Sequence, residues 1–189
     1  MKKAVIIFAG PRKHSNTALL VEQAQRGLEE AGAETEIFRL NELNIRGCQA
    51  CYYCKRDHPL ECALKDDMAP ILQALKEADA MILASPVYWG SITAQGKLWL
   101  DRLFPCIDLN LTPLLPPGKK AAYIFTQNQP DPDLFAANLR GVETMLQHIG
   151  FQPAGDLIAC DLDSGIKPMV SERPELLEAA YRLGKNLLG

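Results

Sequence analysis

Four of the six cysteines of this chain lie close together, in the pattern Cys-x2-Cys-x2-Cys-x7-Cys. They are Cys48, Cys51, Cys54 and Cys62. Thiolates are soft ligands that select iron–sulfur clusters or zinc, and their close spacing lets one loop wrap a small inorganic core. The repeat of three residues fits a cubane cluster better than the paired C-x2-C units of a zinc ribbon. A zinc clip, a redox disulfide and a vestigial motif without metal remain open alternatives.

The two other cysteines, Cys106 and Cys160, adjoin apolar segments. A free cysteine in such a place usually acts as a small buried hydrophobe, so we predict that both fill the core. His58 lies inside the cysteine-rich segment, and we interpret it as a solvated loop residue rather than a ligand.

A second group of polar side chains follows the first apolar run. Arg12 precedes Ser15, Asn16 and Thr17, which begin a helical pattern. Free N–H groups and the positive end of the helix dipole favour an anion there, and Arg12 adds a charge-assisted contact. These residues predict a phosphate site, without the spacing of a dinucleotide fingerprint or a P-loop. The alternative is a plain helix N-cap that binds nothing. His14 is expected to face solvent.

A third group, residues 86–91, follows another apolar run. Its residues are Pro86, Val87, Tyr88, Trp89, Gly90 and Ser91. Two adjacent aromatic side chains are costly to expose, so the sequence predicts that something covers them. A flat ring system suits this geometry, because backbone N–H groups around Gly90 are available for its polar edge. Packing against the next helix or against a dimer partner is the alternative.

An alternating series of strands and helices must position these groups. Apolar β-rich runs predict strands over residues 3–9, 34–40, 80–84, 120–126 and 156–160. Helical patterns predict helices over residues 15–31, 66–78, 93–104, 133–149 and 174–188. This order predicts an α/β fold with a doubly wound parallel sheet and helices on both faces. Ligands bind beyond the carboxyl ends of such strands, so the loops after the first, third and fourth strands are expected to form the site.

Length and composition limit the remaining possibilities. The 189 residues predict a single domain, residues 1–189, with a cysteine-rich loop inserted at about 44–64. The net charge of −3 and the lack of a like-charge block argue against nucleic-acid binding. No apolar run approaches the ~20 residues of a membrane span, and residues 1–9 read as a buried strand rather than a signal peptide. We expect a cytoplasmic protein, whose thiols stay reduced.

These motifs together resemble the NADPH-dependent FMN reductase family. The resemblance rests on Gly10-Pro11-Arg12 with Ser15-Asn16-Thr17, on Ser85-Pro86-Val87-Tyr88-Trp89-Gly90-Ser91, and on Lys97 with Asp101-Arg102. It extends from residue 3 to about residue 126. Within the family, the chain is most similar to the iron–sulfur flavoprotein branch. The resemblance implies a flavodoxin-like fold with strand order 2-1-3-4-5 and FMN bound at the strand ends.

The resemblance also implies roles for individual residues. It assigns the FMN phosphate to Arg12, Ser15, Asn16 and Thr17, and the isoalloxazine ring to residues 86–91. Relatives often carry a glycine after the threonine that ends the fourth strand, whereas here Thr126 is followed by Gln127 and Asn128. One of these two is expected to donate to the ring instead. In the iron–sulfur branch, cysteines in this compact motif ligate a 4Fe–4S cluster. Tyr52 and Tyr53 lie inside the motif and are expected to shield either the cluster or the flavin.

The function implied is an FMN-dependent oxidoreductase that moves electrons between NAD(P)H, or a one-electron carrier, and an acceptor. No catalytic side chain is required, because the flavin N5 carries the chemistry. A cluster near the flavin converts two-electron into one-electron transfer, which implies a ferredoxin-like partner beside small-molecule donors or acceptors. One alternative is a cluster-free NAD(P)H-dependent FMN or quinone reductase. The other is a non-catalytic flavin- or metal-binding sensor module.

A homodimer or homotetramer is expected as well. The family resemblance suggests it, and the aromatic content near the site exceeds what one small domain is expected to bury. The residues concerned are Tyr52, Tyr53, Tyr88, Trp89 and Trp99.

Overall fold

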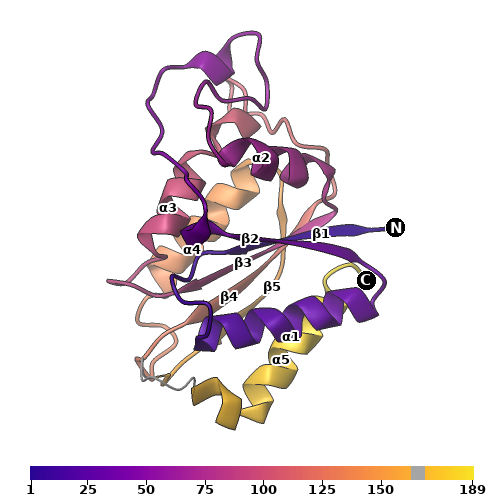
Figure 1. Cartoon of the computed structure of the whole chain (residues 1–189), viewed down its shortest axis with the longest axis vertical. Coiled ribbons are helices and arrows are strands. Elements are labelled where there is room, and N and C mark those ends of the chain that lie inside the picture. Colours follow the sequence, from indigo (N-terminus) through magenta and orange to yellow (C-terminus); the bar gives the residue numbers. More distant parts are fainter. Residues whose placement is uncertain (163–168) are drawn as a thin grey trace.

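A five-stranded sheet lies between two layers of helices in the computed structural model, which describes residues 1–162 and 169–189 (Figure 1). The strands are β1 Lys3–Phe8, β2 Glu34–Arg39, β3 Ala80–Pro86, β4 Lys120–Thr126 and β5 Gln152–Ala159. All neighbouring strands are parallel, in the order β2-β1-β3-β4-β5. This order confirms the doubly wound, flavodoxin-like α/β fold expected from the sequence.

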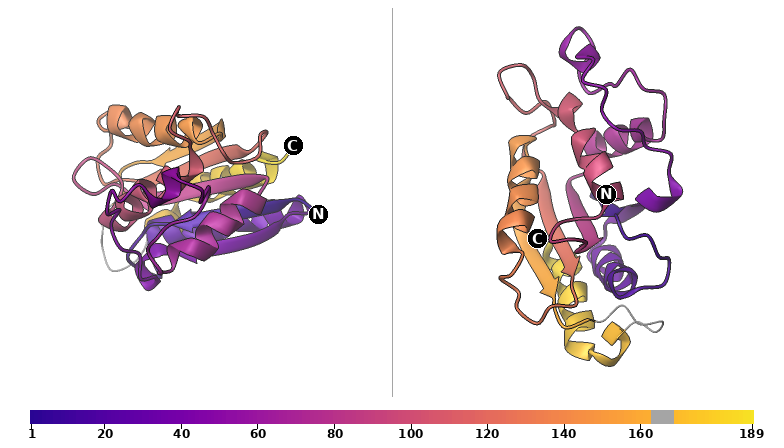
Figure 2. Two further views of the ribbon diagram at one scale, coloured as in Figure 1. Left: turned by 90° about the horizontal axis from the view of Figure 1, so that it is seen from above. Right: turned by 90° about the vertical axis from the view of Figure 1, so that its left-hand side faces the viewer.

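Helices cover both faces of this sheet (Figures 1 and 2). One face carries α1 Asn16–Glu30 and α5 Pro174–Asn186. The other carries α2 Met68–Glu77, α3 Ala94–Asp101 and α4 Ala136–His148. Short 3₁₀ turns occur at η1 Leu40–Glu42, η2 Tyr53–Lys55, η3 Phe104–Cys106 and η4 Met169–Glu172. None of the helices in the described part of the chain has the length and apolar character that crossing a membrane requires.

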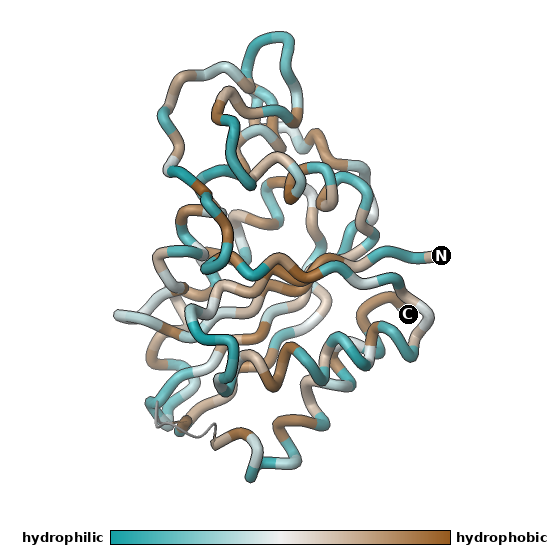
Figure 3. The backbone as a smooth tube through the Cα atoms, viewed as in Figure 1, coloured by the Kyte–Doolittle hydropathy of each residue, from teal (hydrophilic) through white to brown (hydrophobic). Residues whose placement is uncertain are grey.

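The apolar run of β1 enters two separate cores. Val5 and Ile7 pack with α2 and α3, whereas Ala4 and Ile6 pack with α1 and α5. Successive strand residues point to opposite faces, and a central parallel strand is buried on both, so it reads as continuously apolar. Figure 3 shows this as a hydrophobic centre within more polar outer loops. The carboxyl end of β1 is therefore firmly fixed in the sheet.

Two glycines let α1 and α5 approach each other closely. A Cβ on Gly184 would stand 1.9 Å from the carbonyl oxygen of Ala24, and one on Gly27 would stand 2.1 Å from that of Tyr181. Any side chain at either position would push the two backbones apart. This contact fixes α1, whose first turn carries Ser15, Asn16 and Thr17.

Strand β5 begins at Gln152, earlier than the expected 156. Pro153 and Gly155 hid this start, because both residues are unfavourable in a strand interior. An edge strand tolerates Pro153, and Gly155, with φ of +135°, lies where the register against β4 shifts between Ala121 and Tyr123. The strand is therefore a bulged edge strand. The other bounds differ from expectation by a few residues; α3, for example, ends at Asp101 rather than 104.

The cysteine-rich segment, residues 44–64, contains no strand and no α-helix, and only the short turn η2. Its ends are tied to the start of α2: the carboxylate of Asp66 accepts the Arg46 N–H at 3.0 Å, and that of Asp67 accepts the Asn44 N–H at 2.7 Å. Figure 2 shows the segment projecting beyond α2 and α3, on the side away from α5. The segment is also tied at its middle, where Lys55 donates to the carbonyls of Phe104 and Ile107 and the N–H of Leu60 donates to that of Pro105 at 3.3 Å.

Candidate functional site

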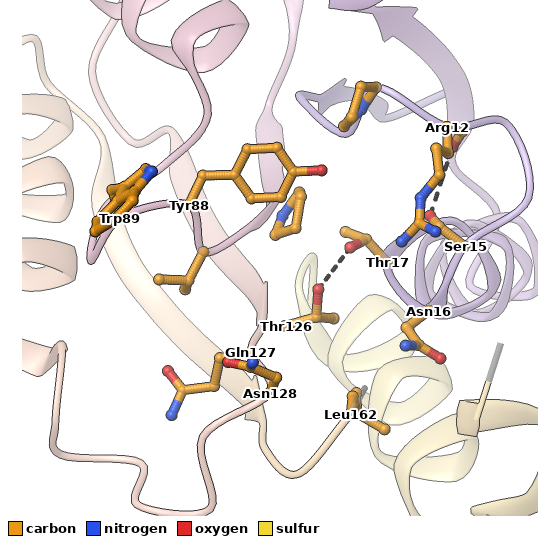
Figure 4. Close-up of a pocket in the computed structure, with 13 residues that line it drawn as sticks. Arg12, Ser15, Asn16, Thr17, Tyr88, Trp89, Thr126, Gln127, Asn128 and Leu162 are labelled. Carbon is orange, nitrogen blue, oxygen red and sulfur yellow. Dashed lines mark hydrogen bonds between the residues drawn. The ribbon is translucent and has the colours of Figure 1, made fainter. Parts of the chain in front are cut away.

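A pocket of about 380 Å³ opens at the carboxyl ends of β1, β3 and β4 (Figure 4). Small-molecule and cofactor pockets commonly measure about 300–1,000 Å³. The residues that line it are Pro11, Arg12, Ser15, Asn16, Thr17, Pro86, Val87, Tyr88, Trp89, Thr126, Gln127, Asn128 and Leu162. The structure therefore brings together all three loops that the sequence singled out. Pro11 and Leu162 are additions; Leu162 follows β5, and no sequence signal marked it.

Gly90 and Ser91 do not line this pocket, although the sequence grouped them with Tyr88. The N–H of Tyr88 donates to the carbonyl of Ser91 at 2.8 Å, and the N–H of Ser91 donates back to Tyr88 at 3.2 Å. Trp89 and Gly90 between them have positive φ angles of +48° and +80°, which is typical of a type I′ turn. The Ser91 N–H thus closes a turn, and Trp89 lies exposed at the pocket's edge (Figure 4).

The start of α1 faces the pocket. Ser15 is the N-cap, and its hydroxyl accepts the N–H of Ala18 at 3.2 Å. The first N–H groups of a helix lack partners within the helix, and the first turn of α1 contains no acidic residue to compete with an anion. The two interpretations of this sequence are therefore compatible: Ser15 is an ordinary N-cap, and the helix end it caps lines a pocket.

Asn16 and Thr17 connect this helix end to other elements. The side-chain oxygen of Asn16 accepts the N–H of Val170 at 2.9 Å. The hydroxyl of Thr17 lies 2.7 Å from that of Thr126, at the end of β4. Asn16, Thr17 and Thr126 are all buried. The phosphate-binding candidates are thus held by the fold before any ligand arrives.

Gln127 is buried beside the pocket, and its side-chain amide is oriented by the loop that follows. Its Nε2 donates to the carbonyl oxygens of Asp131 at 2.7 Å and Gln129 at 3.3 Å. Its Oε1 is buried and has no hydrogen-bond partner among the described residues. The Oε1 of Gln127 can therefore accept a hydrogen bond from a ligand, and the donor expected from Gln127 or Asn128 stays a prediction.

The four clustered cysteines line a second, smaller hollow where the cysteine-rich segment meets α3 and η3. Cys48, Cys51, Cys54 and Cys62 share it with Tyr52, Arg102, Phe104 and Pro105, among others. All six cysteines are free thiols. Cys48 and Cys51 are exposed, Cys54 and Cys62 are half-buried, and burial raises the pKa of Cys54.

The donor set fits a multinuclear cluster by the type and number of its thiols. No group of three or more His, Cys, Asp or Glu side chains that could hold a metal ion occurs within residues 1–162 and 169–189. A mononuclear site needs ligands that converge on one ion, whereas each thiolate of a cubane binds a different iron. Four thiols spread around one hollow satisfy the second requirement.

The remaining sequence candidates divide clearly. Cys106 is fully buried, and burial raises the pKa of its thiol to about 12, which confirms it as a core residue. The same expectation is wrong for Cys160, which is half-buried with its Sγ 3.5 Å from Nε2 of Gln127. The two cysteines differ in position: Cys160 directly follows the end of edge strand β5, whereas Cys106 ends the turn η3 within the core. His14 is exposed, and His58 stacks on Tyr53 with ring centroids 4.1 Å apart.

The sequence matches a known protein family over more than half of its length. The family model of NADPH-dependent FMN reductase matches residues 2–126. An iron–sulfur flavoprotein of Methanocaldococcus jannaschii is 41% identical over 103 residues, which cover 54% of this chain and 52% of that protein. One from Archaeoglobus fulgidus is 39% identical over 103 residues, covering 54% of this chain and 46% of that protein. The chain spans about half the length of the curated relatives it matches.

Solved structures show the same fold along the whole chain. An NAD(P)H:quinone oxidoreductase from Methanothermobacter marburgensis has a TM-score of 0.82 at 22% identity, covering 100% of this chain and 98% of that chain. An FMN-dependent NADH-azoreductase from Bacillus anthracis has a TM-score of 0.69 at 18% identity, and the match covers 97% of this chain and 100% of that chain. The family match includes the first two loops of the main pocket and ends at Thr126, where the third begins, and the chain therefore belongs to the NADPH-dependent FMN reductase family.

Proposed function

We propose that residues 1–189 form one FMN-binding domain that works as an NAD(P)H-dependent oxidoreductase. The observation that carries this proposal is the pocket itself. Three loops far apart in the sequence meet there, at the carboxyl edge of the sheet, with a helix N-terminus on one side and Tyr88 on the other. A phosphate group and a flat ring fit these two sides. The solved relatives named as quinone oxidoreductase and azoreductase support the reaction class.

The chain's own residues bind and orient the cofactor in this proposal. FMN, when bound, supplies the hydride and electron chemistry. The first N–H groups of α1, with Arg12 and the hydroxyl of Thr17, hold its phosphate. Pro86, Val87 and Tyr88 lie along the ring and exclude water from it. The Oε1 of Gln127 accepts a hydrogen bond from the ring's polar edge.

We propose further that Cys48, Cys51, Cys54 and Cys62 hold a 4Fe–4S cluster. The shared hollow of the four free thiols supports this, as do the relatives named iron–sulfur flavoprotein. Such a cluster supplies one-electron transfer, so the proposed partners are a ferredoxin-like carrier or a small-molecule acceptor. Free clustered thiols also suit the reducing cytoplasm, where we place the protein.

A homodimer or homotetramer is part of the proposal. Trp89 is 106% exposed, Tyr52 56% and Tyr88 46%, and a second copy would cover them. The expectation that Trp99 adds to this exposed aromatic surface is wrong, because its side chain is fully buried against the sheet. Sedimentation at micromolar concentration tests this expectation, and a 20.9 kDa species alone would contradict it.

The experiment that tests the function is anaerobic purification and reconstitution, followed by absorbance, iron and sulfide assay, and NADPH oxidation. Flavin, iron and turnover together support the whole proposal. We expect Cys62→Ala to lose iron and Cys106→Ala, which removes a buried thiol that does not line the hollow, to keep it. Flavin with turnover but no iron leaves a cluster-free reductase, and flavin without turnover leaves a sensor module.

A further inference from the structure

Arg102 is a buried cation at the wall of the cysteine hollow. It follows α3 directly and is 1% exposed. Its two terminal nitrogens bond to the carboxylate of Asp66, at 2.6 Å through Nη1 and 3.0 Å through Nη2. Nη1 also donates to the carbonyl of Arg46 at 2.7 Å. A forked, fully enclosed ion pair of this kind holds the guanidinium in one orientation.

The third nitrogen of this guanidinium is unsatisfied. The Nε of Arg102 is buried and has no hydrogen-bond partner in the part of the chain that the structure describes. A buried donor without an acceptor is costly, and it calls for an explanation such as an absent ligand. Asp66 occupies the edge of the guanidinium opposite Nε, so it does not satisfy this donor.

Cys62 lines the same hollow as Arg102, and of the four cysteines it lies closest in the sequence to Asp66, the carboxylate that Arg102 holds. Burial lowers the pKa of Arg102, but its hydrogen bonds to Asp66 and its charge interaction with Cys62 outweigh that effect and raise it. Lys55, the cation next to Cys54 in the sequence, is engaged elsewhere: its ammonium lies 3.7 Å from the centroid of the Phe104 ring and donates to the carbonyls of Phe104 and Ile107.

We propose that Arg102 is a positioning residue that donates its Nε–H to the sulfur of Cys62 in the cluster-bound protein and so raises the cluster's reduction potential. This inference rests on the proposed cluster. Hydrogen bonds to ligand sulfurs and local charge are among the factors that set the potential of an iron–sulfur cluster. One-electron reduction adds a negative charge without making or breaking a bond, so a fixed donor and cation stabilise the reduced form more than the oxidised form.

Two variants separate this role from a purely structural one. Arg102→Lys keeps the charge beside Asp66 and removes the Nε–H donor. The double variant Asp66→Asn with Arg102→Gln removes both buried charges, and so leaves no unpaired carboxylate to destabilise the fold. Lys97→Gln is the matched control, because Lys97 is an exposed cation on the same helix, paired with Asp101 at 2.5 Å.

The measurement is a dye-mediated redox titration of the anaerobic, cluster-loaded protein, followed by absorbance and by electron paramagnetic resonance. We expect the reduction equilibrium constant of the cluster to fall about tenfold in both Arg102 variants, which is a potential about 59 mV more negative for a one-electron couple. We expect Lys97→Gln to keep the wild-type potential. Iron and sulfide are assayed in each sample, so cluster content and cluster potential are known separately.

Several outcomes overturn the inference. Unchanged potentials in cluster-loaded Arg102 variants reject it and leave the proposed function intact. A loss of iron with no change in the potential of the remaining cluster makes Arg102 merely structural. If the double variant does not fold, Arg102→Lys alone decides. If the wild type never takes up iron, the proposed cluster and this inference both fail, whereas FMN measured in the same sample still tests the flavin site.

Discussion

The hydroxyl of Thr17, in the first turn of α1, lies 2.7 Å from the hydroxyl of Thr126, the last residue of β4. These residues are 109 positions apart in the sequence, and both are buried at the pocket. Each hydroxyl has one proton to donate. When Thr126 donates to Thr17, the proton of Thr17 is free for an anion. The end of one strand thereby orients a donor on a helix.

Thr126→Val tests this relationship. The variant keeps the side-chain shape but leaves the Thr17 hydroxyl without the bond that orients it. We expect the dissociation constant of FMN to rise about fivefold, because one such hydrogen bond contributes roughly 1 kcal/mol. Fluorescence quenching during flavin titration measures it. Thr126→Ser keeps the hydroxyl and is expected to bind as the wild type does; equal affinities in all three proteins would reject the assignment.

Ser15→Asp tests the phosphate site without removing the helix cap. Aspartate caps a helix as well as serine does, and its charge favours the positive helix end, so the melting temperature should hold. The same charge opposes a phosphate. We expect FMN affinity to fall by at least about tenfold, with riboflavin, which lacks the phosphate, unaffected in titration calorimetry.

Ser15→Asn is the control for this variant, because it caps the helix without adding charge. It is expected to bind FMN nearly as tightly as the wild type. Equal losses for FMN and riboflavin in Ser15→Asp would place the phosphate elsewhere.

Gly184→Ala should destabilise the protein. In most helices the same replacement raises the free energy of unfolding by about 0.5–1 kcal/mol. Its Cβ would stand 1.9 Å from the Ala24 carbonyl oxygen, so α1 and α5 must separate. We expect a cost of about 1–3 kcal/mol, measured by urea unfolding. Gly141→Ala in α4 is the matched control, since a Cβ there meets nothing within 4 Å. A stable Gly184→Ala protein would disprove the close contact.

Asp66→Asn should show a pH-dependent loss of stability. Burial alone raises the pKa of Asp66, but its bonds to Arg102 and to the N–H groups of Arg46 and Met68 hold that pKa below its usual range. The carboxylate therefore contributes stability above its unfolded pKa of about 3.9, and loses it as the pH falls through the folded value.

We expect Asp66→Asn to cost about 3–5 kcal/mol near neutral pH, because it leaves Arg102 as an uncompensated buried charge. The difference from the wild type should narrow at pH values below the ordinary aspartate pKa, in urea unfolding at a series of pH values. A constant difference from neutral to acid pH would mean that Asp66 is not ionised in the fold.

The sheet and the main pocket were predictable because their signals are local. Continuous apolar runs mark β1, β3 and β4, and parallel strands must present their carboxyl ends, hence Arg12, Tyr88 and Thr126, at one edge. Features that depend on which other elements pack against a segment were not predictable from the sequence. Pro153 and Gly155 concealed the start of β5, because only its place at the sheet edge permits them.

Burial of polar and aromatic side chains was likewise outside the reach of the sequence. Arg102 looks like a surface cation until Asp66, 36 positions away, is placed against it. Trp99 and Trp89 are the same residue type near the same site, yet only the fold decides that one is enclosed. Gln127 or Asn128 was expected to donate to a bound ring, and only the fold shows that the Nε2 of Gln127 is engaged by the carbonyls of Asp131 and Gln129.

The two tryptophans of the chain give it a built-in optical readout. Trp99 is fully enclosed in the core, whereas Trp89 stands in solvent at the edge of the main pocket. In a protomer whose Trp89 is not covered by a second copy, a soluble quencher such as iodide should therefore extinguish the red-edge emission of Trp89 and spare the bluer emission of Trp99. Filling of the pocket and melting of the core can thus be followed in one unlabelled sample, each through its own indole.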